Sequence, residues 1–247
     1  MENAGYIALS RQLTLQRSID ITANNIANST TSGFKAHGLL FEEYLQKNPS
    51  KENSFEMVND YGLFMDTSEG SFKHTDNPLD LAIQGPGFFQ VETEEGLRYT
   101  RTGEFQLNAA GEIVTGAGHI LTSTTNAPIV VPPGTTEIEI TKDGNVVAFS
   151  PVADVANIGQ IGMFEFTNAQ NLQQIGNNLY TAVNEEPLRS RDSAILQGTV
   201  EQSNVEPVTE ITKLIQLSRD YQAAQKMISD EHDRIRNAIS TLSGRNS

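Results

Sequence analysis

Apolar residues recur at heptad spacing along the C-terminal part of the chain. Alternating steps of three and four select Ile211, Leu214, Ser218, Tyr221, Gln225, Ile228, His232, Ile235, Ile239 and Leu242. This pattern covers about four and a half heptads and predicts a long helix with a narrow apolar seam. The polar positions within the seam suit a surface that selects its pairing register. Because long helices usually need a partner helix, we interpret the segment as a coiled-coil helix; the alternative is a surface helix on its own domain.

The residues before this seam mark the start of the helix. Asn204 is a candidate N-cap, and Pro207 suits the first turn. Glu206 and Glu210 favour the positive end of the helix dipole. We therefore expect the helix to begin close to residue 206.

The N-terminal segment has a weaker helical pattern with two apolar strips. One face holds Ala4, Ala8, Leu15, Ile19 and Ile26, and an adjacent strip holds Leu9 and Leu13. Two strips imply more than one neighbouring helix. The helix should end near Asn28, because the serine, threonine and glycine residues at 29–33 disfavour it. Small residues alternate with amides in 23–28, which suits a close interface or, equally, a polar helix end that frays into a loop.

Short apolar runs separated by turn residues fill the middle of the chain. The expected strands are 81–84, 88–92, 97–100, 105–107, 112–115, 129–131, 137–141, 146–149 and 161–166. Asp143-Gly144 predicts a two-residue hairpin turn. Residues 36–75 carry aromatics without a sustained period, so we expect an extended connector. The predicted fold is α+β with a mainly β core: an N-terminal helix at 1–35, the connector at 36–75, an antiparallel β-domain at 76–197 and a C-terminal coiled-coil helix at 198–247.

Charge is distributed unevenly between these segments. The chain has 17 basic and 31 acidic residues, a net charge of −14. Residues 1–35 have a net charge of +1 and residues 206–247 a net charge of 0, so the middle carries −15. Near-neutral ends can pack against copies of themselves, whereas an acidic middle stays solvated. No basic stripe is present to neutralise phosphates, which argues against nucleic-acid binding.

The residues offer little catalytic or ligand-binding chemistry. The chain has no cysteine, and its four histidines are dispersed without metal-ligand spacing. Gly85-Pro86-Gly87 lacks a phosphate-loop lysine and is expected to be a turn. Pairs such as Asp76 with Asp80 arise by chance in an acidic segment. We therefore expect no catalytic residue, cofactor, metal or small-molecule substrate; we also expect no membrane insertion and no cleaved signal peptide.

Four stretches resemble the flagellar basal-body rod and hook proteins. They are the opening MENAGYIALSRQLTLQRSIDITANNIAN, the signature ANNIANSTTSGFK at 23–35, the central NPLDLAIQGPGFFQVETEEGLRYTRTGEFQLNAAGEIVTGAGHIL at 77–121 and GTVEQSNVEPVTEITKLIQLSRDYQAAQKMI at 198–228. The match covers nearly the whole chain, although 36–75 and 150–195 match only loosely. The opening is similar to proximal rod members of the family, and the distal rod members are the alternative.

The resemblance implies a structural subunit of the axial rod, which crosses the periplasm and transmits motor torque for motility. It implies that the terminal helices pair in an inner coiled-coil layer with copies of the chain and other rod proteins. It also implies passage through the flagellar type III export apparatus. The residues expected at assembly interfaces are Leu15, Ile19, Ala23, Asn24, Asn25, Ile26, Ala27, Asn28, Gly33, Phe34, Lys35, Asn204, Val205, Ile211, Leu214, Tyr221, Ile228, Ile235, Ile239 and Leu242.

The residues alone also allow two interpretations from other functional classes. One is an unrelated coiled-coil fibre or adhesin subunit. The other is a polysaccharide-acting enzyme with helical oligomerisation arms. Neither accounts for the four stretches together.

Overall fold

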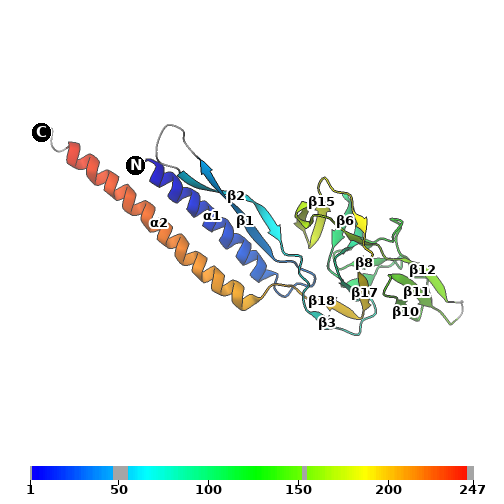
Figure 1. The fold of residues 1–247 in the computed structure, drawn as a ribbon. Helices are drawn as coiled ribbons and strands as arrows, with labels where there is room; N and C mark the ends of the chain where they lie inside the picture. Colours follow the sequence, from blue (N-terminus) through cyan, green and yellow to red (C-terminus); the bar gives the residue numbers. More distant parts are fainter. Residues whose placement is uncertain (1, 47–54, 152–154, 244–247) are drawn as a thin grey trace. The chain divides into compact units, whose positions relative to one another are not determined.

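A computed structural model describes residues 2–46, 55–151 and 155–243 of the chain (Figure 1). The described residues form two compact units, and each is built from segments that are far apart in the sequence. The helical unit comprises Met1–Ala27, His37–Phe64 and Glu206–Ser247, and the β unit comprises Asn28–Ala36 and Met65–Val205.

The helical unit consists of two helices and a two-stranded sheet. Its elements are α1 (Glu2–Ala27), β1 (His37–Gln46), β2 (Phe55–Met65) and α2 (Pro207–Ser243). The two helices lie side by side and run in opposite directions, because Gln12 contacts Tyr221 while Asn25 contacts Glu210 (Figure 1). Strands β1 and β2 pair with each other. Residues expected to form an irregular extended connector thus include two long strands.

Helix α1 ends where the sequence predicts, and α2 begins slightly later than Asn204 would suggest. Pro207 is the first helical residue of α2, in agreement with its expected place in the first turn. The expectation that Asn204 caps this helix is wrong. Its side-chain oxygen instead accepts a hydrogen bond from the Ala36 backbone N–H at 2.7 Å. The carbonyl of Glu206 accepts the first helical bond, from Glu210 N at 3.1 Å.

The β unit is an assembly of short strands that pair with one another in antiparallel fashion. A nine-stranded sheet has the order β14-β15-β6-β5-β9-β8-β7, with β13 pairing both β5 and β16. A separate three-stranded sheet has the order β10-β11-β12, and β17 pairs β4 while β18 pairs β3. The strands are β3 (Phe72–His74), β4 (Leu81–Gln84), β5 (Phe88–Thr93), β6 (Gly96–Thr100), β7 (Phe105–Leu107), β8 (Ile113–Thr115), β9 (Ile120–Leu121), β10 (Glu137–Ile140), β11 (Asn145–Phe149), β12 (Ala156–Gln160), β13 (Met163–Glu165), β14 (Leu172–Gly176), β15 (Leu179–Ala182), β16 (Leu188–Arg189), β17 (Ala194–Gln197) and β18 (Thr199–Glu201), and a 3-10 turn covers Ala169–Asn171.

The hairpin expected at Asp143-Gly144 is present, with a longer loop than a two-residue turn. Strands β10 and β11 pair on either side of it, and Thr141 N bonds Asn145 O at 3.0 Å. Gly144 has a φ of 84°, which closes a three-residue loop of the kind that ends in a left-handed residue. The expected strand at 129–131 is absent, because Val130 forms only an isolated bridge with Glu112.

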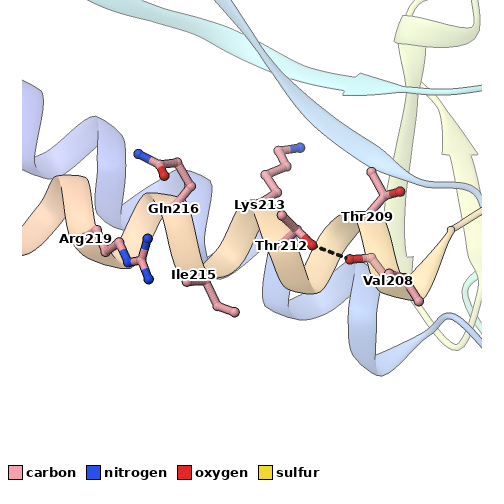
Figure 2. Close-up of a pocket in the computed structure, with 7 residues that line it drawn as sticks. All are labelled: Val208, Thr209, Thr212, Lys213, Ile215, Gln216 and Arg219. Atoms are coloured by element: carbon pink, nitrogen blue, oxygen red, sulfur yellow. Dashed lines mark hydrogen bonds between the residues drawn. The ribbon is translucent and has the colours of Figure 1, made fainter.

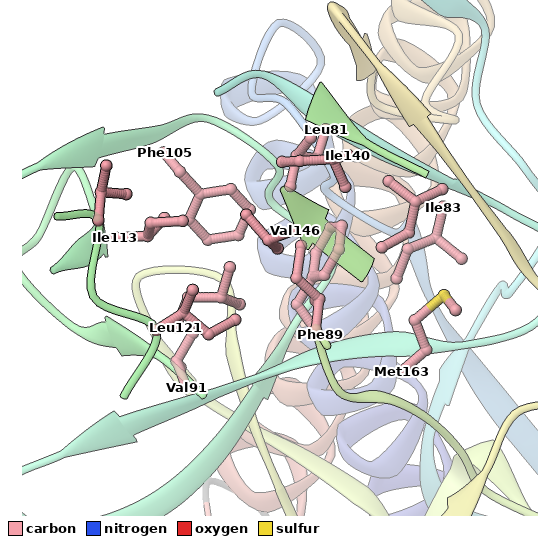
Figure 3. Packing of buried hydrophobic residues seen from close by; sticks show 14 of the residues in the cluster. Leu81, Ile83, Phe89, Val91, Phe105, Ile113, Leu121, Ile140, Val146 and Met163 are labelled. Atoms are coloured by element: carbon pink, nitrogen blue, oxygen red, sulfur yellow. The ribbon is translucent and has the colours of Figure 1, made fainter. Parts of the chain in front are cut away.

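Two apolar clusters form the core of the β unit. The larger one gathers aliphatic residues and Phe89 from most of the short strands; Leu81, Ile83, Phe89, Val91, Ile113 and Leu121 are fully buried (Figure 3). The second is aromatic, with Phe88, Tyr99, Phe164 and Tyr180. Burial of each such side chain stabilises the fold by about 1.5–3 kcal/mol. Many short strands thus share one core, which holds the ends of the unit's two chain segments in fixed places.

Candidate assembly interface

The inner surface of α2 packs on α1 within the same chain. We define the inner stripe of α2 as Leu214, Leu217, Tyr221, Ala224 and Ile228, which recur at heptad spacing and are buried or half-buried. The stripe shares Leu214, Tyr221 and Ile228 with the predicted seam. At the alternate positions the apolar Leu217 and Ala224 replace the polar Ser218 and Gln225, because burying an alkyl group costs less than burying an unpaired amide.

Apolar residues continue along the same side of α2 beyond the inner stripe. Ile235 and Ile239 follow Ile228 on the same side of the helix, and their exposed fractions are 41% and 61%. A shallow groove there is lined by Ala8 of α1 and by α2 residues that include Ile228 and Ile235. We call Ile235 and Ile239 the distal stripe. Leu242, also expected in the seam, has a side chain outside the described residues.

A second apolar surface lies on the opposite side of α2. Val208, Ile211 and Ile215 form it at helical spacing, with exposed fractions of 75%, 46% and 50%. We call these residues the outer face. Val208 and Ile215 border a shallow groove made entirely by α2, in which Thr212 also donates a 2.9 Å hydrogen bond to the Val208 carbonyl (Figure 2). The sequence analysis singled out Ile211 but missed Val208 and Ile215, although their i, i+7 spacing was a usable signal.

On α1 the two predicted strips differ in burial. Ala8 and Thr22 are buried, Leu15, Ile19 and Ile26 are half-buried, and Leu9 and Leu13 are 48% and 64% exposed. Of the signature residues, Ala23, Asn24 and Ala27 are exposed and Asn28 is half-buried. The helix thus buries one strip within the protomer and leaves the other on its surface.

Asn25 connects three elements of the helical unit. Its side-chain amide donates to the His37 carbonyl at 2.8 Å and to Glu210 Oε2 at 3.3 Å, and its oxygen accepts from the His37 N–H at 3.0 Å. Its exposed fraction is 1%. The residue thus ties the end of α1 to the start of β1 and the first turn of α2. Burial also lowers the pKa of the neighbouring His37, because the charged imidazole loses hydration.

The end of the signature segment is buried within the β unit by an ion-pair cluster. Lys35 Nζ lies 2.7 Å from Glu201 Oε1, and Arg101 Nε lies 2.5 Å from Glu201 Oε2. Lys35 also donates to the Ser68 carbonyl, and Arg101 donates to the carbonyls of Gly87 and Ile83. We call these three charged residues the clasp.

The clasp is electrostatically unequal, because it holds two cations and one anion. Burial lowers the pKa of Lys35, and the Glu201 carboxylate only partly offsets that effect. Burial alone would raise the pKa of Glu201, but Arg101 and Lys35 outweigh it and hold that pKa below its usual value. Glu201 is therefore ionised at neutral pH and pairs with both neighbouring cations.

Close backbone packing surrounds the clasp. Gly33 has a φ of 69° and donates its N–H to the Glu201 carbonyl at 2.8 Å. A Cβ at this position would lie 2.5 Å from the Arg101 carbonyl carbon, so only glycine fits without movement. Phe34 is fully buried beside it.

Asn204 and Val205 complete this part of the β unit. The Asn204 amide donates to the Asp66 and Ser68 carbonyls at 3.0 and 3.1 Å, and Val205 is 7% exposed. The predicted interface residues therefore form two groups. Asn28, Gly33, Phe34, Lys35, Asn204 and Val205 lie within the β unit, whereas the other predicted residues belong to the helical unit.

Family models match the chain in three places. A model for "Flagella basal body rod protein" matches residues 6–35, one for "Flagellar hook protein FlgE/F/G D1 domain" matches 82–148, and one for "Flagellar basal body rod FlgEFG protein C-terminal" matches 196–241. The chain is 37% identical to the flagellar basal-body rod protein FlgF of Caulobacter vibrioides over 247 residues, which cover 98% of each chain. The chain belongs to the flagellar basal-body rod protein family.

Other relatives agree with that assignment. The FlgF of Mesorhizobium japonicum is 34% identical over 98% of each chain. The FlgG of Bacillus subtilis is 30% identical over 92% of this chain and 94% of its own. The similarity to FlgF is thus higher and extends further along both chains. The protein is a structural rod component and not an enzyme, as the sequence analysis expected.

Within 2–46, 55–151 and 155–243 no group of three acidic or histidine side chains is placed to hold a metal ion. No helix in these ranges is long and apolar enough to cross a membrane.

Proposed function

We propose that this rod subunit occupies the proximal rod and assembles axially through apolar surfaces of its terminal helices. The outer face of α2, the distal stripe and the exposed Leu9 and Leu13 of α1 would each receive a helix of a neighbouring subunit. The single observation that carries the proposal is the presence of apolar residues on two opposite sides of α2, of which α1 covers only one. Exposed apolar stripes of this kind are typical of surfaces that become buried in an assembly.

Charge supports the same arrangement. Residues 206–247 have a net charge of 0, so copies of α2 approach each other without strong repulsion, whereas residues 36–205 carry −15. We infer that the helices form coiled-coil contacts between subunits and that the acidic residues stay in solvent. In this arrangement the rod transmits motor torque through packed helices.

The proposal is tested with Ile215→Asp on the outer face and Ile239→Asp on the distal stripe, in a strain that lacks the chromosomal gene. Both side chains are at least half exposed, so each subunit should keep its helical content by circular dichroism. We expect loss of motility and no subunit in purified basal bodies, because an introduced carboxylate would be buried without a partner.

The matched control is Leu188→Asp, an exposed leucine of the β unit with an exposed fraction of 53%. It should leave motility and incorporation unchanged. Normal incorporation of both helix variants would refute assembly through these surfaces.

The distal rod is the alternative position, because FlgG proteins are also relatives. The higher identity to FlgF favours the proximal rod. Complementation of strains that lack either rod protein distinguishes the two: we expect rescue only where the FlgF gene is deleted.

We further propose that the subunit reaches the periplasm through the flagellar export apparatus without cleavage. Rod-incorporated protein should then retain residues 2–10 in a mass spectrum. A shortened N-terminus would contradict uncleaved export.

A further inference from the structure

The apolar contacts between α1 and α2 do not by themselves select one register. Apolar residues recur every seven positions along this side of α2, at Leu214, Tyr221 and Ile228 of the inner stripe and at Ile235 of the distal stripe. A slip of one heptad therefore places one apolar residue where another was, and moves α2 by about 10 Å along α1. Most of these side chains are only half-buried, so the apolar packing is weakly selective, although a slip would also break the Asn25–Glu210 and Gln12–Tyr221 hydrogen bonds between the helices.

The chain is held firmly just outside both helices. On the side that follows α1, Gly33 N bonds Glu201 O, and Lys35 bonds the Glu201 carboxylate. On the side that precedes α2, Gln202 N bonds Ser71 O at 2.8 Å, and Asn204 N bonds Phe34 O at 3.4 Å. The segments that lead out of α1 and into α2 are thus bonded to each other inside the β unit.

These bonds leave no slack for a slip of one heptad. Val205 is the last residue of the β unit and Pro207 the first of α2, so α2 begins almost at the clamped segment. Likewise α1 ends at Ala27 and the β unit begins at Asn28. Displacing α2 by about 10 Å would require residues 202–206 to detach.

We propose that the clasp of Lys35, Glu201 and Arg101, together with Asn204, sets the register in which α1 pairs with α2. The clasp residues are positioning residues: they act through the chain segments that they hold and touch neither helix seam. Register decides which apolar residues of α2 are covered by α1 and which remain on the surface. The proposal concerns the single protomer and goes beyond the assembly role.

The experiment measures the distance between two spin labels on the full-length protein by pulsed electron paramagnetic resonance. The chain contains no cysteine, so Arg11→Cys on α1 and Arg236→Cys on α2 give unique sites, and both side chains are exposed. Dilution with unlabelled protein restricts the signal to pairs within one chain. The insertion variant carries seven additional Gly and Ser residues between Val205 and Glu206. No residue of the clasp or of the helix seam is changed.

The parent protein should give one distance. The insertion variant should give a second population displaced by about 10 Å. The matched control carries the same seven residues in the exposed loop after Pro133 of the β unit, and it should match the parent. A single unchanged distance in the insertion variant would overturn the proposal, because the helices would then fix their own register.

A second variant tests the anion of the clasp directly. Glu201→Gln removes the anion of the clasp without lengthening the chain, and it should also produce the displaced population while ellipticity at 222 nm shows that the helices persist. Asn25→Ala, which removes the amide within the helical unit, should keep the single distance. If Asn25→Ala gives the displaced distance and the other variants do not, Asn25 sets the register and the clasp proposal fails.

Discussion

Lys35 Nζ lies 2.7 Å from Glu201 Oε1, although 166 positions separate the two residues in the sequence. Both side chains are at most 3% exposed, and Arg101 approaches the same carboxylate from the other side. The contact joins the segment after the first helix to the segment before the last one. It therefore closes the β unit on itself.

Replacement of the shared anion should weaken the β unit strongly. Glu201→Gln leaves Lys35 and Arg101 buried without a counter-charge, which should lower the free energy of unfolding by about 3–5 kcal/mol. Chemical denaturation followed by near-ultraviolet circular dichroism of the aromatic cluster measures this change.

The control is Lys35→Met, which leaves one neutral Arg101–Glu201 pair and should cost clearly less, about 1–2 kcal/mol. Equal losses in the two variants would contradict the assigned charge balance.

Gly33 should tolerate no side chain. Gly33→Ala places a Cβ 2.5 Å from the Arg101 carbonyl carbon at a φ of 69°, so the melting temperature of the β unit should fall by several degrees, in line with a loss of about 1–3 kcal/mol. Gly134→Ala is the control: its φ is 84° but nothing lies within 4 Å of the added carbon. A larger loss at Gly134 would show that backbone conformation, and not contact with Arg101, decides the outcome.

Removal of the Asn25 amide should destabilise the helical unit. Asn25→Ala removes the hydrogen bonds that this amide makes to the His37 N–H and C=O, at a cost of about 2–4 kcal/mol. Urea unfolding at 222 nm measures the loss. The exposed Gln222→Ala should change stability by less than about 0.5 kcal/mol. If both variants unfold at the same urea concentration, Asn25 does not tie these elements together.

Acid should weaken the helical unit through His37. Burial lowers the folded-state pKa of His37 below 6.5, so the unfolded chain takes up a proton first as the pH falls. The stabilising effect of neutral His37 is complete above about pH 6.5 and declines as the pH falls towards the folded-state pKa. Urea midpoints at pH 7.5 and 5.5 test this, with His37→Gln as the variant that should lose the dependence. An identical pH dependence in both proteins would exclude His37 as the cause.

The helix ends and many strand bounds could be predicted from local pattern. Pro207 and the polar residues after Asn28 mark helix boundaries through their own backbone preferences, and β4 and β7 coincide with the apolar runs that predicted them. Strand β14 was missed because Leu172–Gly176 is mostly polar and exposed. The turn between β14 and β15 could have been recognised from the pair Asn177-Asn178. These residues have φ values of 50° and 55°, which suit a two-residue hairpin.

The clasp could not be predicted from local pattern. Arg101 and Glu201 lie 100 positions apart, and neither follows a periodic pattern that would place the two together. The left-handed Gly33 and buried Phe34 indicate a special backbone conformation but do not identify its partners. The burial of Asn25 likewise depends on β1, a strand in a segment where the sequence has no clear period.

The chain passes between its two units four times, after Ala27, Ala36, Phe64 and Val205. Neither unit therefore corresponds to one continuous stretch of the gene, and neither can be excised, swapped or appended as a module. Descendants of such a protein can diverge by lengthening surface loops such as the one around Gly134, but recombination within residues 28–205 would break the β unit.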